Sequence, residues 1–145
     1  MNVASGSKFE YRVSARRTDS HGSEANAKSA SITLDTDVGG RQDAFNPAEL
    51  LLASLAACMI KGAERALPML HFELSGIEVR LHGIRQDVPP RITEIDYEII
   101  VDTKEDDHRI ELLHTNIRKY GTISNTLALA LKLQGTIKRT IATTN

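Results

Sequence analysis

The 145-residue sequence has only one cysteine, Cys58, and no excess of charge of either sign. A single cysteine cannot form a disulfide within the chain, and a lone thiol is typical of proteins in a reducing compartment. The chain has 18 lysine and arginine residues against 19 aspartate and glutamate residues, so its formal net charge is −1. Because a general nucleic-acid binder usually carries a basic excess, we expect no nucleic-acid partner.

The sequence also lacks a long apolar run. No stretch approaches the roughly 20 apolar residues of a membrane-spanning helix, and no apolar run follows Met1. We therefore expect neither membrane insertion nor secretion, and with the lone thiol this predicts a cytoplasmic protein. Hydrophobic residues make up 41% and charged residues 26% of the chain, an ordinary globular composition. We expect one domain over residues 1–145.

Alternating apolar and polar residues predict several half-buried strands. These strands are expected at residues 8–15, 31–35, 77–82, 95–101 and 135–142. The polar stretch 18–28 is interpreted as a turn, and the segment 37–45, which contains Gly39-Gly40, as a loop. A turn at residues 86–90 predicts that the strands on either side of it form an antiparallel hairpin.

The strongest local signal is the start of a helix at Asn46. Asn46, Pro47 and Glu49 resemble a capping box with proline at the first helical position. The apolar run LLLASLAACMI follows, and the helix is predicted to end before Pro68 after about 20 residues. A helix that is apolar on nearly every side must be covered nearly all round. We expect a second subunit to supply part of that cover in an intimate homodimer.

Two shorter helices are expected after the hairpin. Asp106 or Asp107 can cap the first, whose inner face carries Ile110, Leu113 and Ile117, and Gly121 ends it. The second begins near Thr122. The predicted class is α+β, with antiparallel sheets packed around a long central helix.

Cys58 shares its face of the long helix with Ser54, Lys61 and Arg65. Two cations on the same face favour the reactive thiolate form of a cysteine. The alternative is that Cys58 is a small core residue and that Lys61 and Arg65 only complement the negative end of the helix dipole.

Glu49 precedes Cys58 by nine residues, which places it on the opposite face of the helix and about 13 Å away along the axis. Glu49 is therefore either a capping residue only, or it reaches the cysteine of another subunit across a dimer interface. The five histidines show no metal-ligand spacing, and no recognised phosphate-binding loop is present. We expect neither a metal nor a cofactor.

The segment NPAELLLASLAAC, residues 46–58, resembles a motif of the OsmC/Ohr family of osmotically inducible and organic-hydroperoxide-resistance proteins. Residues 118–127, RKYGTISNTL, resemble the second motif of that family, and the expected element order is similar over essentially the whole chain. The resemblance implies a closely packed dimer with active sites at the subunit interface. In the peroxidase members, a thiolate on the long helix attacks the peroxide and a second cysteine resolves the sulfenic acid. Cys58 matches the attacking position.

The chain departs from this pattern at the resolving position, where it has Gly121 and where no other thiol can substitute. In many hydroperoxide-resistance members a glutamate directly follows the proline, where this chain has Ala48, and Glu49 comes one residue later. The resemblance also implies an arginine that supports the thiolate. Arg17 is the first candidate and Arg41 the second.

Three functional hypotheses follow from the resemblance. In the first, the protein is a one-cysteine hydroperoxide reductase of oxidative stress defence, in which a small hydrophobic peroxide oxidises Cys58 and an external thiol reduces it. In the second, it is a non-enzymatic, dimeric stress-associated or small-ligand-binding protein that keeps the fold without peroxidase turnover. In the third, it is a redox sensor in which Cys58 is glutathionylated or crosslinked to a partner.

Overall fold

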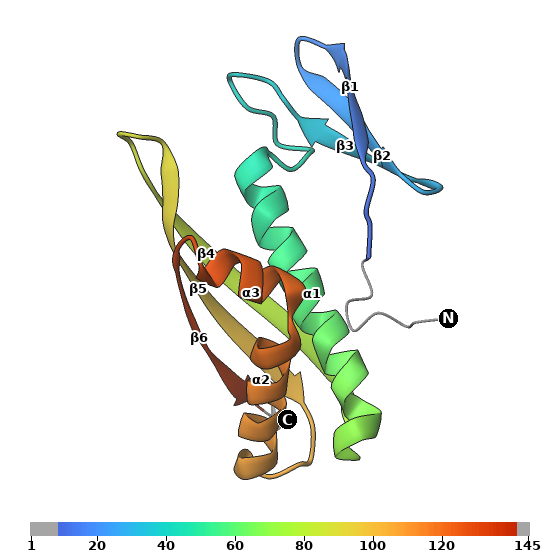
Figure 1. Ribbon diagram of the computed structural model, residues 1–145, viewed down its shortest axis with the longest axis vertical. Coiled ribbons are helices and arrows are strands. Elements are labelled where there is room, and N and C mark those ends of the chain that lie inside the picture. The colour runs from blue at the N-terminus through green and yellow to red at the C-terminus, as the bar shows by residue number, and fades with distance from the viewer. Residues whose placement is uncertain (1–8, 142–145) are drawn as a thin grey trace, which may run out of the picture. The chain divides into compact units, whose positions relative to one another are not determined.

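The computed structural model describes residues 9–141 and divides between Leu50 and Leu51 into two compact units. The elements follow one another along the chain as shown in Figure 1: β1 (Ser14–Asp19), β2 (Gly22–Ala27), β3 (Ala30–Asp35), α1 (Pro47–Leu70), β4 (Gly76–Gln86), β5 (Arg91–Asp102), α2 (Asp107–Tyr120), α3 (Thr122–Ala128) and β6 (Lys132–Arg139). The predicted α+β class is confirmed. The expectation of one domain over residues 1–145 stays a prediction.

The N-terminal unit contains a three-stranded antiparallel sheet in the order β1-β2-β3. The prediction of a turn at residues 18–28 is wrong, because β2 occupies most of that stretch. Its buried residues include Ser23, which is polar, and Ala25, which is small, so they do not give the clear apolar alternation of a strand. The first strand also begins later than predicted, at Ser14, so the apolar residues at 9, 11 and 13 precede it and are exposed.

The C-terminal unit contains a second three-stranded sheet in the order β4-β5-β6. The predicted hairpin of β4 and β5 is confirmed, with Ile77 opposite Val101 and Leu81 opposite Tyr97. β6, however, pairs parallel to β5, which makes this sheet mixed rather than purely antiparallel. The parallel pairing follows from the chain between the two strands, because α2 and α3 form the crossover that a parallel connection needs.

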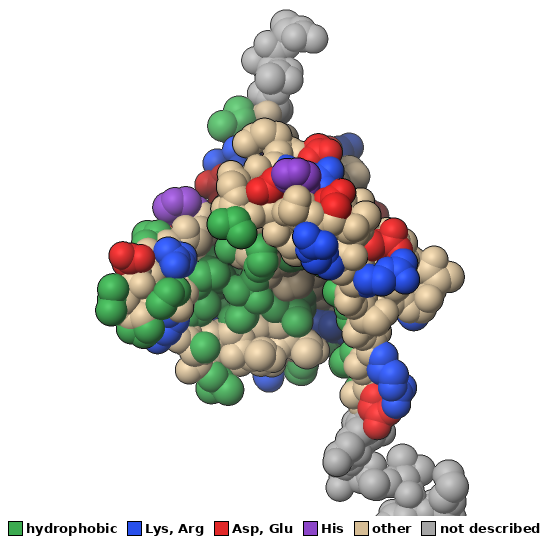
Figure 2. Space-filling model, turned by 90° about the horizontal axis from the view of Figure 1, so that it is seen from above, with side chains coloured by type: hydrophobic (Ala, Val, Ile, Leu, Met, Phe, Trp, Pro, Cys, Tyr) green, Lys and Arg blue, Asp and Glu red, His purple; other side chains and the backbone are tan. Residues whose placement is uncertain are grey.

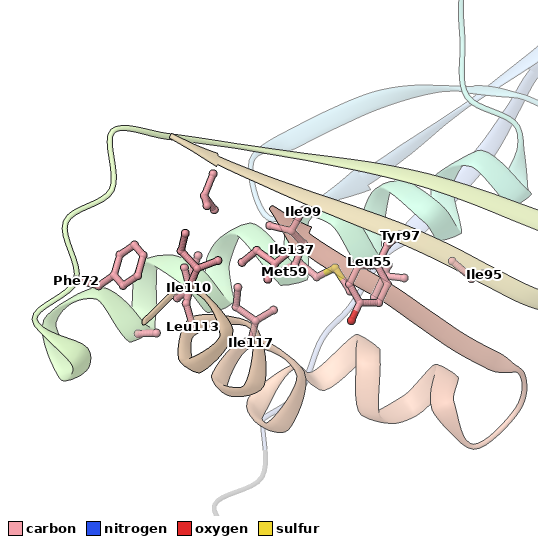
Figure 3. Close-up of a cluster of buried hydrophobic side chains, with 13 residues drawn as sticks. Leu55, Met59, Phe72, Ile95, Tyr97, Ile99, Ile110, Leu113, Ile117 and Ile137 are labelled. Carbon is pink, nitrogen blue, oxygen red and sulfur yellow. The ribbon is translucent and has the colours of Figure 1, made fainter. Parts of the chain in front are cut away.

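The core of the C-terminal unit lies between one face of its sheet and the helices α1 and α2 (Figure 3). Alternate residues of β5 point into it, and α1 and α2 each contribute an apolar stripe. Its fully buried large side chains are those of Leu55, Met59, Ile95, Ile99, Val101, Leu113 and Ile117. The inner face predicted for α2 is therefore confirmed. Of the two candidate caps, Asp106 is the one that caps the helix, and its side chain accepts a hydrogen bond from Arg109 N–H.

α1 continues past the predicted end and includes Pro68. A proline inside a helix removes one backbone hydrogen bond, but here the loss falls in the last turn. That turn is held from outside, because Arg109 of α2 donates hydrogen bonds to the carbonyl oxygens of Leu70 and His71. Backbone hydrogen bonds from Phe72 to Leu67 and from His71 to Pro68 also close this turn, so the helix ends later than the rule based on Pro68 predicts.

The apolar first half of α1 is only partly covered within the chain. From Leu51 to Ile60 only Leu55 and Met59 are buried, and the other residues keep exposed surface. Uncovered hydrophobic side chains also gather on the face of the molecule shown in Figure 2, next to charged side chains of both signs. One chain alone therefore does not bury all of the apolar surface of α1 that the sequence analysis expects to be covered. None of the helices among residues 9–141 is long and apolar enough to cross a membrane.

Candidate functional site

Cys58 lies in the half-covered part of α1 as a free, partly buried cysteine. One turn later, Gly62 is buried against α2, where a Cβ at position 62 would stand 3.8 Å from Cα of Ile117. α1 and α2 therefore approach closely just beyond the thiol, without burying it completely. Ser54, one turn before, donates its hydroxyl to the carbonyl oxygen of Leu51 at 2.7 Å, so that hydroxyl is already engaged with the helix backbone.

Arg65 is the cation whose side chain folds back toward the turn of α1 that follows Cys58. One of its guanidinium nitrogens would be 3.5 Å from a Cβ at Gly62, and its guanidinium carbon lies 6.0 Å from the centre of the Tyr120 ring. Lys61, the other cation predicted on this face, is exposed, and so is Arg65. The Arg65 guanidinium therefore lies against the turn of α1 that follows the partly exposed thiol.

Glu49 acts as a capping residue at the start of α1. Its carboxylate accepts a hydrogen bond from the backbone N–H of Asn46 at 2.9 Å, and the Asn46 side-chain oxygen accepts one from the N–H of Glu49 at 2.8 Å. The predicted capping box is therefore present. A role at the cysteine of another subunit stays a prediction.

The two candidate arginines belong to the N-terminal unit, whereas Cys58 belongs to the C-terminal unit. The Arg41 guanidinium forms a two-pronged ion pair with Asp43, at 2.6 and 2.8 Å, and this hydrogen bonding lowers the pKa of the Asp43 carboxyl. Arg17 is exposed on β1, opposite Ser23. A role for either arginine at the thiol stays a prediction.

Gly121 joins α2 to α3 and has no room for a side chain. A Cβ there would stand 2.9 Å from the carbonyl oxygen of Ile117 and 3.0 Å from Oγ of Ser124. The φ angle of Gly121, −80°, suits any residue, so only this crowding opposes a larger side chain. Position 121, which the family resemblance compares with a resolving cysteine, thus suits glycine.

A further cluster was missed by the sequence analysis. Tyr97 of β5 places its hydroxyl oxygen 2.6 Å from Nε2 of His114, and Arg118 donates a hydrogen bond to the same hydroxyl at 3.0 Å. Burial is the main cause that lowers the pKa of His114. The four-residue spacing of His114 and Arg118 on α2 was a visible signal. Their meeting with Tyr97 was not, because it depends on how α2 docks onto the sheet.

Comparison with known families places the chain's motifs in context. The sequence model of the family described as OsmC-like protein matches residues 39–134, a stretch that contains Cys58, Glu49 and Gly121. Among curated proteins, none matches this chain.

Solved structures share the fold. An OsmC-like protein from Mycoplasma pneumoniae is 21% identical, with a TM-score of 0.84, and the match covers 93% of this chain and 100% of that one. An organic hydroperoxide resistance protein OsmC from Legionella pneumophila is 14% identical, with a TM-score of 0.73 and coverage of 92% and 99%. The organic hydroperoxide resistance protein OhrB of Bacillus subtilis is 18% identical, with a TM-score of 0.65 and coverage of 90% and 98%.

Proposed function

The chain belongs to the OsmC-like family, and on that basis we propose that it is a thiol-dependent organic hydroperoxide reductase that acts through Cys58. The observation that carries the proposal is the environment of the thiol. Cys58 is free and partly exposed, and Arg65 packs against the next turn of the same helix face. The organic hydroperoxide resistance proteins that share the fold support the substrate class.

The proposed reaction uses one cysteine of this chain and two external thiols. The Cys58 thiolate attacks an oxygen of the hydroperoxide, so an S–O bond forms, the O–O bond breaks and an alcohol leaves after protonation. An external thiol then attacks the sulfenic sulfur, which releases water and leaves a mixed disulfide. A second external thiol attacks the mixed disulfide, regenerates Cys58 and leaves as part of a small disulfide. External thiols are needed because the chain has no second cysteine.

The active form in this proposal is a homodimer. The residues Leu51–Ile60 leave apolar surface uncovered within one chain, and a second copy would bury it and exclude water from the thiol. The partner could also bring Glu49 or an arginine near Cys58. Light scattering coupled to size exclusion should give a dimer at micromolar concentration, and a monomer there would remove this part of the proposal.

Turnover with cumene hydroperoxide and dithiothreitol tests the chemistry directly. We expect loss of peroxide and, without the dithiol, a sulfenic acid at Cys58 that dimedone traps as a mass shift. Cys58→Ser should abolish both signals. Arg65→Gln should slow the oxidation of Cys58 several-fold. The matched control Lys61→Gln should have a smaller effect, because it is the Arg65 guanidinium that lies against the turn at Gly62.

The competing function is a dimeric binding protein without turnover. The observation that favours it is Gly121, whose surroundings exclude the side chain of a resolving cysteine. An intact, dimeric protein that neither consumes the peroxide nor forms the dimedone adduct would reject the reductase proposal and leave this alternative.

A further inference from the structure

A groove of about 650 Å³ lies between α2 and β6, and the chemistry proposed for Cys58 does not use it. Its wall contains a buried tyrosine, a histidine, two cations and an apolar side chain. The residues that matter here are Tyr97, His114, Arg118, Lys119, Leu133 and Gly135. All of them belong to the C-terminal unit.

The groove depends on the absence of a side chain at Gly135. In the parallel pairing of β5 and β6, Gly135 is the partner of Tyr97. A Cβ at position 135 would overlap the Tyr97 carbonyl and ring. Glycine therefore lets the ring lie against β6 while its hydroxyl reaches toward the helices that cover the sheet (Figure 3).

The Tyr97 hydroxyl joins two side chains of α2 in one hydrogen-bonded chain. Its oxygen accepts the N–H of Arg118 at 3.0 Å, so its own proton is available for Nε2 of His114, 2.6 Å away. In this arrangement the proton of the neutral imidazole lies on Nδ1, which faces the Glu111 carboxylate at 3.7 Å. Burial, aided by the charge of Arg118, lowers the pKa of His114, which keeps the ring neutral at pH 7.

The groove therefore presents positive charge beside an apolar wall. Arg118 uses one of its five N–H donors in the hydrogen bond to Tyr97, and its other N–H groups can bind a ligand. Lys119 adds a second cation. None of the described residues that line the groove is acidic. The carboxylate of Glu111 lies on the Nδ1 side of His114, and Leu133 supplies apolar surface.

From this arrangement we propose that the groove binds a small molecule with one oxyanion group, a carboxylate or a phosphate ester, on an apolar body. The guanidinium of Arg118 pairs with the oxyanion, since its planar donors match two oxygens at once. Lys119 strengthens the attraction at the mouth. The apolar body lies along Leu133.

Four probes test separately whether the oxyanion and the apolar body are each needed for binding. Benzoate and phenyl phosphate carry an aromatic body with an oxyanion, benzamide is the neutral analogue of benzoate, and inorganic phosphate lacks the apolar body. In titrations of the full chain followed by amide NMR, we expect benzoate or phenyl phosphate to shift the signals of His114, Arg118 and Gly135. Benzamide and inorganic phosphate should bind at least several-fold more weakly.

Substitutions test whether Arg118 binds the oxyanion of the ligand. Arg118→Gln should weaken the better probe by roughly tenfold or more, because a charge-assisted pair is lost. Arg91→Gln, the same change at an exposed position that does not line the groove, should leave the affinity unchanged. Cys58→Ser should also bind normally, which separates this site from the proposed redox chemistry.

Three results would overturn the proposal. One is the absence of shifts at these residues with any probe at millimolar concentration. Another is equal affinity for benzoate and benzamide, or for phenyl phosphate and phosphate. The third is an Arg118→Gln variant, shown by its NMR spectrum to be folded, that binds as well as the parent chain.

Discussion

Asn46 and Glu49 cap α1 reciprocally: the side chain of each accepts a hydrogen bond from the backbone N–H of the other, at 2.8 and 2.9 Å. This relationship gives Glu49 a local structural role in the first turn. It also means that a loss of activity on changing Glu49 cannot be assigned to chemistry unless the cap is kept intact.

Two substitutions at Glu49 separate the cap from the charge. Glu49→Ala removes the acceptor and should lower the free energy of unfolding by about 1 kcal/mol in urea denaturation. Glu49→Gln keeps an acceptor suited to a capping box, so its stability should stay near that of the parent chain. If the carboxylate acts at Cys58 of a second subunit, Glu49→Gln loses peroxide turnover while remaining stable. Full turnover in Glu49→Gln would limit Glu49 to capping.

The start of α1 could be predicted because its signal is local. The cap, the proline at the first position and the apolar run all stand within one short segment. β2 could not be predicted in the same way, since its buried residues Ser23 and Ala25 carry almost no hydrophobic signal. The end of α1 was mispredicted for a third reason: besides local backbone hydrogen bonds, its last turn is held by hydrogen bonds from Arg109, 38 or more residues away along the chain.

Arg109 should therefore contribute to stability more than most surface arginines. It binds the carbonyl oxygens of Leu70 and His71, pairs with Glu105 at 2.6 Å, and lies over the Phe72 ring. The last turn of α1 has no basic residue of its own. Arg109→Ala should lower the free energy of unfolding by about 2 kcal/mol, because hydrogen bonds from a charged group are lost.

The matched control for this change is Arg91→Ala, at an exposed position, which should alter the free energy of unfolding by less than about 0.5 kcal/mol. Hydrogen exchange should also show faster opening of the last turn of α1 in Arg109→Ala. Equal stability of the two variants would contradict the capping role of Arg109.

Gly121 should tolerate no larger residue without cost, although its backbone angles are ordinary. Gly121→Ala brings a Cβ against the Ile117 carbonyl and Ser124 Oγ, so it should lower the free energy of unfolding by about 1–3 kcal/mol. In Gly76→Ala the new Cβ would lie 3.7 Å from the nearest atom, Cβ of Asp102, and that variant should be near neutral. Thermal and urea unfolding measure the difference in stability between these two variants. If Gly121→Ala were as stable as Gly76→Ala, the α2–α3 junction would be shown to accommodate the extra Cβ without loss of stability.

Ser124 is buried, and its hydroxyl has no hydrogen-bond partner among residues 9–141. A buried, unpaired hydroxyl costs free energy, so Ser124→Ala should leave stability unchanged or raise it by up to about 1 kcal/mol. The same substitution should soften the effect of Gly121→Ala only in part, because the contact with the Ile117 carbonyl remains. A double-mutant cycle measures this coupling, and a marked loss of stability in Ser124→Ala alone would mean that the hydroxyl is paired in solution.

The residues of the α2–β6 groove illustrate a limit of sequence reasoning. His114 and Arg118 lie one turn apart on a helix that was correctly predicted, and Tyr97 lies on a correctly predicted strand. These residues come together only because α2 docks onto the sheet. The absence of a side chain at Gly135 also matters, because the parallel pairing of β6 with β5 places Gly135 beside Tyr97.

The burial of His114 predicts a specific pH dependence of stability. Its folded-state pKa is lowered, mainly by burial and further by Arg118, while Glu111 opposes the shift; Tyr97 holds Nε2 through its hydroxyl. Between that lowered pKa and the unfolded value of about 6.5, the unfolded chain binds the proton more tightly. The contribution of His114 to stability is therefore complete above about pH 6.5 and is lost as the pH falls through this window.

Urea unfolding at about pH 7.5 and about pH 5.5 should show a smaller decrease for His114→Gln than for the parent chain. His21 provides a control of opposite sign. Its pKa is raised, first by its hydrogen bond to Asp37, so its stabilisation is present below its unfolded value and fades as the pH rises through its folded value. His21→Gln should therefore steepen the loss of stability on acidification, whereas His114→Gln should flatten it. Parallel pH profiles for the parent chain and His114→Gln would contradict the neutral, hydrogen-bonded state assigned to this histidine.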